Sequence, residues 1–204
     1  KKIDHYVIHT GQHYGDEMNK QFFKDFDLDA PDYILDTHST STPIQIAKMI
    51  IGMEDILSKN EPDLVLVYGD SNSALGPALA CAKMGISIGH IEAGLRSFDR
   101  TMPEEINRVV VDHISNFLFA PTDVCKNNLI QEGIDSKHIF VTGNTVVDSV
   151  FHIKDIARTQ SNILDSLKLN QKDFSILTLH RPSNVDNPIK LEEILKSLNQ
   201  LCDE

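Results

Sequence analysis

The sequence predicts an α/β protein built on a doubly wound parallel sheet. Short, strongly apolar runs alternate with longer segments of helical character over most of the chain. One run, Leu64–Tyr68 (LVLVY), is apolar at every position, which is typical of a strand covered on both faces by helices. This alternation favours right-handed βαβ units, whose strands all run parallel.

The expected elements follow one another in a regular order. Strands are predicted at residues 5–10, 33–35, 64–68, 86–91, 117–120, 139–141 and 174–179. Helices are predicted at residues 18–26, 42–56, 74–84, 123–132, 146–159 and 191–201, with one more beginning near Pro103. The first helix depends on the four-residue spacing of Met18, Phe22 and Phe26, which places them on one face.

The second predicted helix begins at Ser41, Thr42 and Pro43. A hydroxyl side chain can cap its free amides, and proline suits the first turn, where no amide hydrogen bond is needed. Its apolar face is expected to consist of Ile44, Ala47, Ile51 and Ile56.

A change in character after Gly143 predicts a domain boundary. A long helical stretch is followed by a polar region, residues 160–173, and then by a new apolar run. We predict one domain at residues 1–150 and, at 151–204, an interdomain helix with the start of a second domain. A single strand and helix cannot bury both of their faces alone.

The composition argues against a nucleic-acid-binding or membrane protein. Nineteen Lys and Arg face thirty Asp and Glu, a net charge of −11, whereas a phosphate-backbone binder needs a basic face. No apolar run approaches the roughly 20 residues that span a bilayer, and the first residues lack a signal-peptide pattern, so we expect a cytoplasmic location. The Cys and His spacings suit no metal, and no dinucleotide fingerprint or P-loop occurs.

Polar residues directly after the predicted strands form the candidate site. They are Gln12 and His13, Asp70, Glu92, and His180 and Arg181. Ligands of open α/β sheets bind at the carboxyl ends of the strands, so carboxylates and a histidine are expected to converge there. Such groups suit general acid–base chemistry, and His180 with Arg181 suits a diphosphate.

Structural interpretations of the same residues remain open at this point. Asp70 also suits an N-cap, and Glu92 also suits a structural ion pair with Arg96. Glu104 suits the first turn of a helix, where the macrodipole favours negative charge. His180 also suits a surface loop, and His90, within a predicted strand, is expected to be a packed core histidine.

Six ordered strings of the chain resemble one enzyme family. They are TGQH (10–13), VYGDSNSALG (67–76), GHIEAGLRSFDRTMPEEINR (89–108), LFAPT (118–122), VTGNTVVD (141–148) and LHRPSNVD (179–186). Together they look like the non-hydrolysing UDP-N-acetylglucosamine 2-epimerases. The resemblance covers nearly the whole chain, and the string at 89–108 is the most specific of the six.

The resemblance implies a GT-B-like fold of two Rossmann-like domains that face each other across a cleft. It implies reversible C2 epimerisation between UDP-GlcNAc and UDP-ManNAc, by elimination and re-addition of UDP through an enzyme-bound 2-acetamidoglucal. No metal or nicotinamide cofactor is implied, a homodimer is expected, and cell-envelope polysaccharide biosynthesis is the expected setting. The alternatives are a hydrolysing relative that releases ManNAc and UDP, and a non-catalytic nucleotide-sugar-binding module.

By motif match, Asp70, Glu92, Glu104 and His180 occupy the family's catalytic positions, and Arg181 belongs to the substrate site. Gln12 and His13 match a segment that in bacterial members helps to bind a second, activating UDP-GlcNAc. Residues 36–43 lack the arginine that such members carry nearby. The family pattern also begins one strand earlier and continues beyond residue 204, so we expect an internal fragment with a truncated second domain.

Overall fold

The structure is a computed structural model that describes residues 3–12, 23, 26, 28–39, 41–169 and 174–202. It divides into two units, Lys1–Asp155 and Ile156–Glu204, which are described separately. The helix predicted at residues 18–26 lies outside the described residues, apart from Phe23 and Phe26. The same holds for His13.

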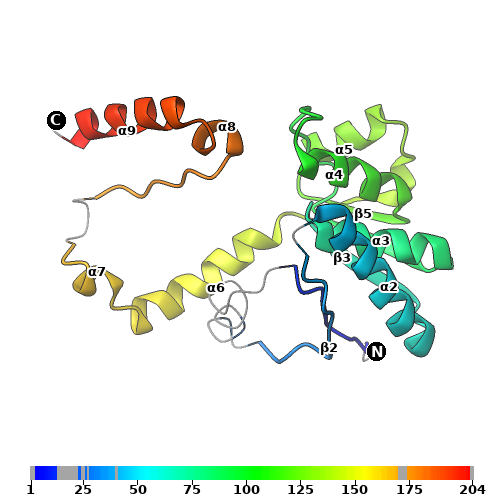
Figure 1. Ribbon diagram of the computed structural model, residues 1–204. Helices are drawn as coiled ribbons and strands as arrows, with labels where there is room; N and C mark the ends of the chain where they lie inside the picture. The colour runs from blue at the N-terminus through cyan, green and yellow to red at the C-terminus, as the bar shows by residue number, and fades with distance from the viewer. Residues whose placement is uncertain are drawn as a thin grey trace. The chain divides into compact units, whose positions relative to one another are not determined.

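The described residues of the first unit form two parallel sheets (Figure 1). Strands β1 (Ile8–His9) and β2 (Tyr33–Ile34) pair with each other. The larger sheet has the order β3 (Leu64–Tyr68), β4 (Ser87–Ile91), β5 (Phe117–Ala120) and β6 (Ile139–Val141), and every pairing is parallel. The predicted parallel α/β class is therefore confirmed, although the first strand is shorter than the predicted residues 5–10.

The helices follow the predicted order closely. They are α2 (Thr42–Asn60), α3 (Asn72–Met84), α4 (Pro103–Ile114), α5 (Asp123–Gln131) and α6 (Thr145–Gln160), with a 3₁₀ turn at Ser136–His138. The second unit contains α7 (Ile163–Ser166), α8 (Pro182–Val185) and α9 (Pro188–Cys202). No helix among the described residues is long and apolar enough to cross a membrane.

Helices α3, α4 and α5 cover the same face of the larger sheet. That face carries Val67, Ile88, Leu118 and Ile139, which pack against these helices. The strand order advances by one position at each βα unit, and right-handed crossovers that advance in one direction place their helices on one face. On the other face Leu64, Leu66 and Tyr68 are exposed in the described part of the chain, so the prediction that β3 is covered on both faces is wrong for these residues.

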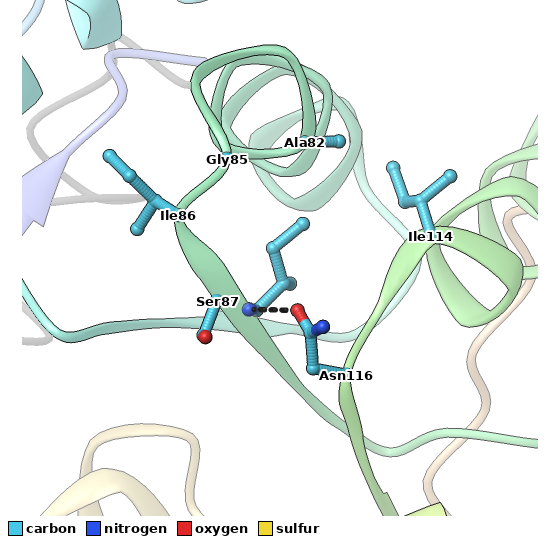
Figure 2. A pocket seen from close by; sticks show the side chains of 7 residues that line it. Ala82, Gly85, Ile86, Ser87, Ile114 and Asn116 are labelled. Atoms are coloured by element: carbon cyan, nitrogen blue, oxygen red, sulfur yellow. Dashed lines mark hydrogen bonds between the residues drawn. The ribbon is translucent and has the colours of Figure 1, made fainter.

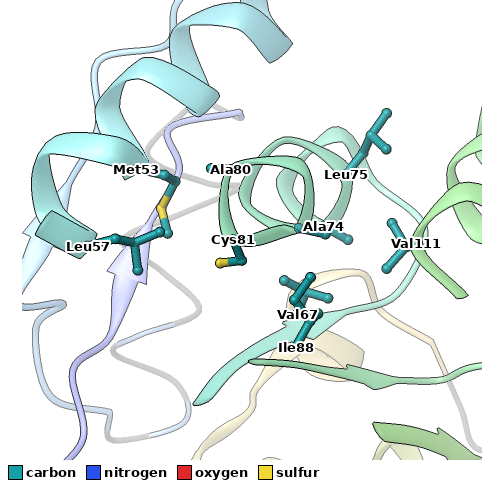
Figure 3. Packing of buried hydrophobic residues seen from close by; sticks show 10 residues of the cluster. Met53, Leu57, Val67, Ala74, Leu75, Ala80, Cys81, Ile88 and Val111 are labelled. Carbon is teal, nitrogen blue, oxygen red and sulfur yellow. The ribbon is translucent and has the colours of Figure 1, made fainter. Parts of the chain in front are cut away.

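The core is centred on α3, whose small side chains allow close packing. Figure 3 shows Cys81 of α3 between the sheet residues Val67 and Ile88 and the α2 residues Met53 and Leu57, with Ala74 on the side of α3 toward Val111. Cys81 is fully buried, as the sequence predicted, and burial raises the pKa of its thiol to about 11.

Helix α2 turns a different face to the core from the one predicted. Its buried residues are Gln45, Met49, Met53, Ile56 and Leu57, whereas Ile44, Ala47 and Ile51 are exposed. Side chains four apart lie on one row of a helix, and α3 packs on the row that runs through the two methionines. Ser41 occupies the N-cap position as expected, but its side chain makes no capping hydrogen bond.

The run at residues 174–179 is not a strand, which corrects the sequence prediction. It is extended and unpaired with any described strand, and Ile176 is 89% exposed. An apolar run becomes a buried strand only where a neighbouring strand and a covering helix are available. Helix α9, predicted at 191–201, is confirmed.

Gly76 tests the close packing of α2 on α3. A Cβ at this position would lie 2.7 Å from the Cβ of Met49, which belongs to a neighbouring backbone and cannot swing away. Helix propensity alone predicts that Gly76→Ala stabilises α3 by about 1 kcal/mol. We expect instead a loss of about 1–3 kcal/mol from overpacking, measured by urea unfolding. The exposed control Lys83→Ala on the same helix should change stability by less than about 0.5 kcal/mol, and an equal or greater stability of Gly76→Ala would contradict this packing.

Candidate active site

Two carboxylates meet where β3 and β4 end. The last residues of these strands, Tyr68 and Ile91, are paired in register, and the Gly69 amide donates to the Ile91 carbonyl at 3.0 Å. Asp70 follows Gly69, and Glu92 follows Ile91 directly. A Cβ on Gly69 would lie 3.4 Å from Oε2 of Glu92, so the Glu92 carboxylate lies against the turn that carries Asp70.

Glu92 adopts a backbone conformation that glycine normally occupies. Its φ is +73°, in the left-handed region, where a residue with a Cβ is strained. Strain of this kind persists only where surrounding structure imposes it, and it is often found at functional sites. The observation is independent of the sequence motif and points to the same residue.

The electrostatic environment makes Glu92 easier to protonate. The pKa of Glu92 is raised, chiefly because the carboxyl group is partly buried and secondly because Asp70 lies nearby. His90 and Arg108 oppose this shift through their positive charge. A carboxyl group with a raised pKa can accept and return protons closer to neutral pH than an ordinary glutamate.

Arg108 of α4 holds Asp70 in place. Its Nη2 donates to Oδ2 of Asp70 in a short ion pair, and its Nη1 lies 3.2 Å from Oε2 of Glu105. Asn107 donates to the Asp70 carbonyl at 2.8 Å. Sequence reasoning did not single out Arg108 or Asn107, although both stand in the string MPEEINR; only the fold brings α4 beside the end of β3.

The two neighbouring glutamates of α4 have different roles. Glu105 is buried, and its carboxylate accepts hydrogen bonds from Ser97 and Phe98 as well as Arg108. Burial raises its pKa, but these hydrogen bonds outweigh burial and the pKa is lowered. Glu104 is exposed in the first turn, one helical turn before Arg108. Glu105 therefore holds the loop at 97–98, and Glu104 is the carboxylate left open to solvent.

Two of the structural alternatives for the carboxylates are wrong. Asp70 is not an N-cap, because Ser71 holds that position of α3 and Asp70 pairs with Arg108. Glu92 is not paired with Arg96, because Arg96 binds Asp112 and Glu132 instead. The interpretation of His90 as a satisfied core histidine is confirmed, since it is fully buried with both ring nitrogens bonded.

Gln12 reaches the same end of the unit from β1. Its Oε1 accepts from the amide and the hydroxyl of Ser73, at 2.9 and 2.8 Å. Gln45, another residue that sequence reasoning missed, lies 3.4 Å from the Gln12 carbonyl and 3.0 Å from Asn72. Asn107 links Asn72 to the Asp70 carbonyl, so a chain of amide side chains connects Gln12 to Asp70.

His180 and Arg181 belong to the second unit, where both side chains are exposed. The Arg181 carbonyl accepts the amides of Asn184 and Val185, which begins α8. The structure thus brings Asp70, Glu92 and Gln12 to one end of the first unit and places His180 and Arg181 at a loop of the second.

A small cavity near the amino-terminal end of β4 is distinct from this site, which lies at the carboxyl ends of the strands. Its volume is about 200 Å³, and it is lined by Ala82, Gly85, Ile86, Ser87, Ile88, Ile114 and Asn116 (Figure 2). Asn116 Oδ1 accepts the Ile88 amide at 2.9 Å, which satisfies the main polar pair shown there. The lining contains no ionisable side chain, so the cavity offers no acid–base group.

Fold and site together define a class: an α/β protein of parallel strands with two acidic residues, Asp70 and Glu92, at the ends of neighbouring strands. A family model described as UDP-N-acetylglucosamine 2-epimerase matches residues 1–204. The chain belongs to this family, and the resemblance predicted from its sequence is confirmed.

The relatives agree with this assignment. A UDP-N-acetylglucosamine 2-epimerase of Methanocaldococcus jannaschii is 46% identical over 98% of this chain and 56% of its own length. A UDP-2,3-diacetamido-2,3-dideoxy-D-glucuronate 2-epimerase of Pseudomonas aeruginosa is 40% identical over 96% of this chain and 54% of its own length. The chain spans about half the length of these relatives.

Solved structures confirm the GT-B-like α/β fold class. The M. jannaschii UDP-GlcNAc 2-epimerase in complex with UDP-GlcNAc and UDP superposes with a TM-score of 0.91 at 46% identity, covering 100% of this chain and 56% of that one. The Rickettsia bellii UDP-N-acetylglucosamine 2-epimerase gives a TM-score of 0.85 at 36% identity, covering 98% of this chain and 52% of that one.

Proposed function

We propose that the chain is the carboxylate-bearing part of an enzyme that interconverts UDP-GlcNAc and UDP-ManNAc by epimerisation at C2. The observation that carries the proposal is the Asp70–Glu92 pair at the ends of β3 and β4, with Glu92 strained and its pKa raised. The solved relative that binds UDP-GlcNAc and UDP supports the ligand class.

The reaction needs the groups that this site offers. A base removes the C2 proton while the bond between C1 and the diphosphate oxygen breaks, which leaves a C1–C2 double bond in the bound 2-acetamidoglucal and releases UDP. An acid then protonates C2 from the opposite face, and UDP adds back at C1. The sequence is redox-neutral, so it needs two proton-transfer groups and a cationic site for the diphosphate rather than an electron carrier.

We assign the proton transfers at C2 to Asp70, Glu92 and Glu104. A raised pKa suits Glu92 to exchange a proton, and the ion pair with Arg108 fixes the position of Asp70. Asp70 raises the pKa of Glu92, so proton exchange at Glu92 depends on its carboxylate neighbour.

We assign His180 and Arg181 to the diphosphate of the substrate. An arginine binds phosphate oxygens through paired charge-assisted hydrogen bonds, and an imidazolium can donate to the departing oxygen. Gln12 and His13 are assigned to substrate binding, as the family resemblance implies. Exposure of His180 and Arg181 leaves both side chains accessible to a ligand.

The proposal extends to the assembly and its setting. We propose a homodimer in the cytoplasm that supplies UDP-ManNAc for cell-envelope polysaccharide, as the family resemblance implies. A hydrolysing enzyme would use the same elimination but add water at C1, releasing ManNAc and UDP.

The isotopic content of the product tests the function. The polypeptide should be prepared as it is encoded, with any residues on either side of these 204, and incubated with UDP-GlcNAc in deuterated water. We expect UDP-ManNAc and UDP-GlcNAc that both carry deuterium at C2, detected by NMR and mass spectrometry. Product without deuterium would refute proton transfer at C2. Free ManNAc would instead identify the hydrolysing reaction, and UDP-2,3-diacetamido-2,3-dideoxy-D-glucuronate serves as a comparison substrate.

A further inference from the structure

A fully buried histidine lies directly behind the two carboxylates. His90 occupies the fourth position of β4 and is 0% exposed. Its Nδ1 lies 2.6 Å from Oδ1 of Asp112, and its Nε2 lies 2.9 Å from the Gly69 carbonyl oxygen. Gly69 precedes Asp70, and His90 stands two residues before Glu92, so the ring lies between the backbones that carry the two carboxylates.

Both ring nitrogens face groups that accept hydrogen bonds. A carbonyl oxygen can only accept, so Nε2 carries a proton. Asp112 is placed as an acceptor, because its other oxygen, Oδ2, receives both the Arg96 guanidinium at 2.7 Å and the Gly94 amide at 3.1 Å. An ionised carboxylate also only accepts, so Nδ1 carries a proton as well. The hydrogen-bond geometry therefore fits a ring that carries a proton on both nitrogens.

The surrounding charges agree with a cation at this position. Arg96 forms a bidentate pair with Glu132 through Nε and Nη2, each at 2.7 Å. The cluster of His90, Arg96, Asp112 and Glu132 then contains two positive and two negative charges. With a neutral His90 the cluster would carry a net charge of −1, and the fully buried Asp112 would share the single cation Arg96 with Glu132, which is costly in a medium of low polarity.

The contacts of this cluster reach the backbone on both sides of the candidate site. His90 fixes the Gly69 carbonyl, one residue before Asp70. Asp112 fixes the Gly94 amide, two residues after Glu92. Glu92 stands between Ile91, whose carbonyl accepts the Gly69 amide, and Gly94, whose amide donates to Asp112. These fixed neighbours hold Glu92 at its strained, positive φ.

We propose that His90 is a positioning residue: as a buried imidazolium held by Asp112, it sets both the spacing and the charge of the Asp70–Glu92 pair. The inference rests on the proposed function for its catalytic consequence, whereas the protonation state of the ring does not depend on it. His90 acts through the carboxylates and is not expected to touch a substrate, since no part of its side chain is exposed.

The charge of His90 acts on the titration of Glu92. The charged groups near Glu92 include Asp70 after β3 and Arg108 on α4. Those clustered with His90 are Asp112 on α4, Arg96 in the loop between β4 and α4, and Glu132 after α5. Asp70 raises the pKa of Glu92, and His90 and Arg108 lower it. Removal of the imidazolium should therefore raise the pKa of Glu92 further.

The protonation state can be measured directly on the chain. Long-range ¹H–¹⁵N correlation spectra of histidine-labelled protein at neutral pH should show one ring with protons on both nitrogens, and this signal should be absent from His90→Gln. A His90 ring with one unprotonated nitrogen would overturn the inference. This readout uses the wild-type protein and holds even if His90→Gln does not fold.

The catalytic consequence is tested with His90→Gln and the control His138→Gln. His138 also bonds a backbone carbonyl, that of Asn116. It directly precedes β6, so it lies at the amino-terminal ends of the strands, opposite the candidate site. We expect His90→Gln to lower kcat about 100-fold with little change in KM, and to move the acidic limb of the pH profile to higher pH. His138→Gln should match the wild type.

Loss of kcat without this shift would show a merely structural role and overturn the inference. Failure of the wild type to exchange the C2 proton would refute the proposed function and leave the NMR result to decide the state of His90.

Discussion

Glu92→Gln is expected to lower kcat for C2 epimerisation by about 10²- to 10⁴-fold, the range lost when a positioned acid or base is removed. Glutamine has the same shape but cannot exchange a proton at its side chain. The loss should appear in kcat, and deuterium incorporation at C2 should fall in parallel, because both depend on the same proton transfer.

Glu61→Gln is a matched control for this change. Glu61 is also a glutamate with a left-handed backbone, φ +44°, but it caps the end of α2 and is exposed. Any general effect of placing glutamine at a positive φ should appear in both variants. Equal rates for Glu92→Gln and Glu61→Gln would remove Glu92 from the proposed mechanism.

The pH profile of the wild type follows from the same residue. The pKa of Glu92 is raised by burial and by Asp70, so the carboxyl group gains its proton at a higher pH than an ordinary glutamate does. As the pH falls through this raised pKa, the base is lost and the rate of C2 exchange should fall. In Asp70→Asn the overall rate should fall because a proposed proton-transfer group is lost, and the acidic limb of the residual activity should move to lower pH because the repulsive charge is absent.

Asp112→Ala is expected to destabilise the chain by about 3–5 kcal/mol, the typical cost of removing one partner from a buried ion pair. Asp112 is fully buried and bonds His90, Arg96 and the Gly94 amide. Its removal leaves two buried cations with Glu132 as their remaining counter-charge. Urea unfolding followed by circular dichroism measures the effect.

The control for this loss is Asp55→Ala. Asp55 forms an exposed ion pair with Lys59 within α2, and such pairs contribute less than about 1 kcal/mol. Asp112→Asn keeps the shape of the side chain and should retain part of the stability. If Asp112→Ala unfolds at the same urea concentration as Asp55→Ala, the buried cluster does not stabilise the fold.

The packing of α2 shows where sequence periodicity reaches its limit. The helix itself and its start near Pro43 follow from local signals, although it continues to Asn60 and not only to Ile56. Its buried row, through Met49 and Met53, could not be chosen from those signals, because isoleucines on another row are equally apolar. Only the position of Gly76 on α3 decides which row comes closest.

The site shows the same division. Placement of Asp70 and Glu92 at the ends of neighbouring strands follows from the apolar runs before them, since parallel strands end at one edge. Their partners do not follow, because Arg108 lies 38 residues after Asp70 in the sequence and reaches it only through the packing of α4. The Arg96–Glu132 pair spans 36 residues, and no local pattern favoured it over Arg96–Glu92.

By itself, the sequence determined the order of the elements, the parallel α/β class, the family and the chemical types at the strand ends. Each of these is recorded within short stretches of chain, as periodicity or as a motif. The tertiary structure alone decided which face of α2 is buried, that residues 174–179 pair with no described strand, and that His90 lies buried against Asp112 behind the carboxylates. Burial and charge depend on neighbours that are distant in the sequence, so only the assembled fold sets them.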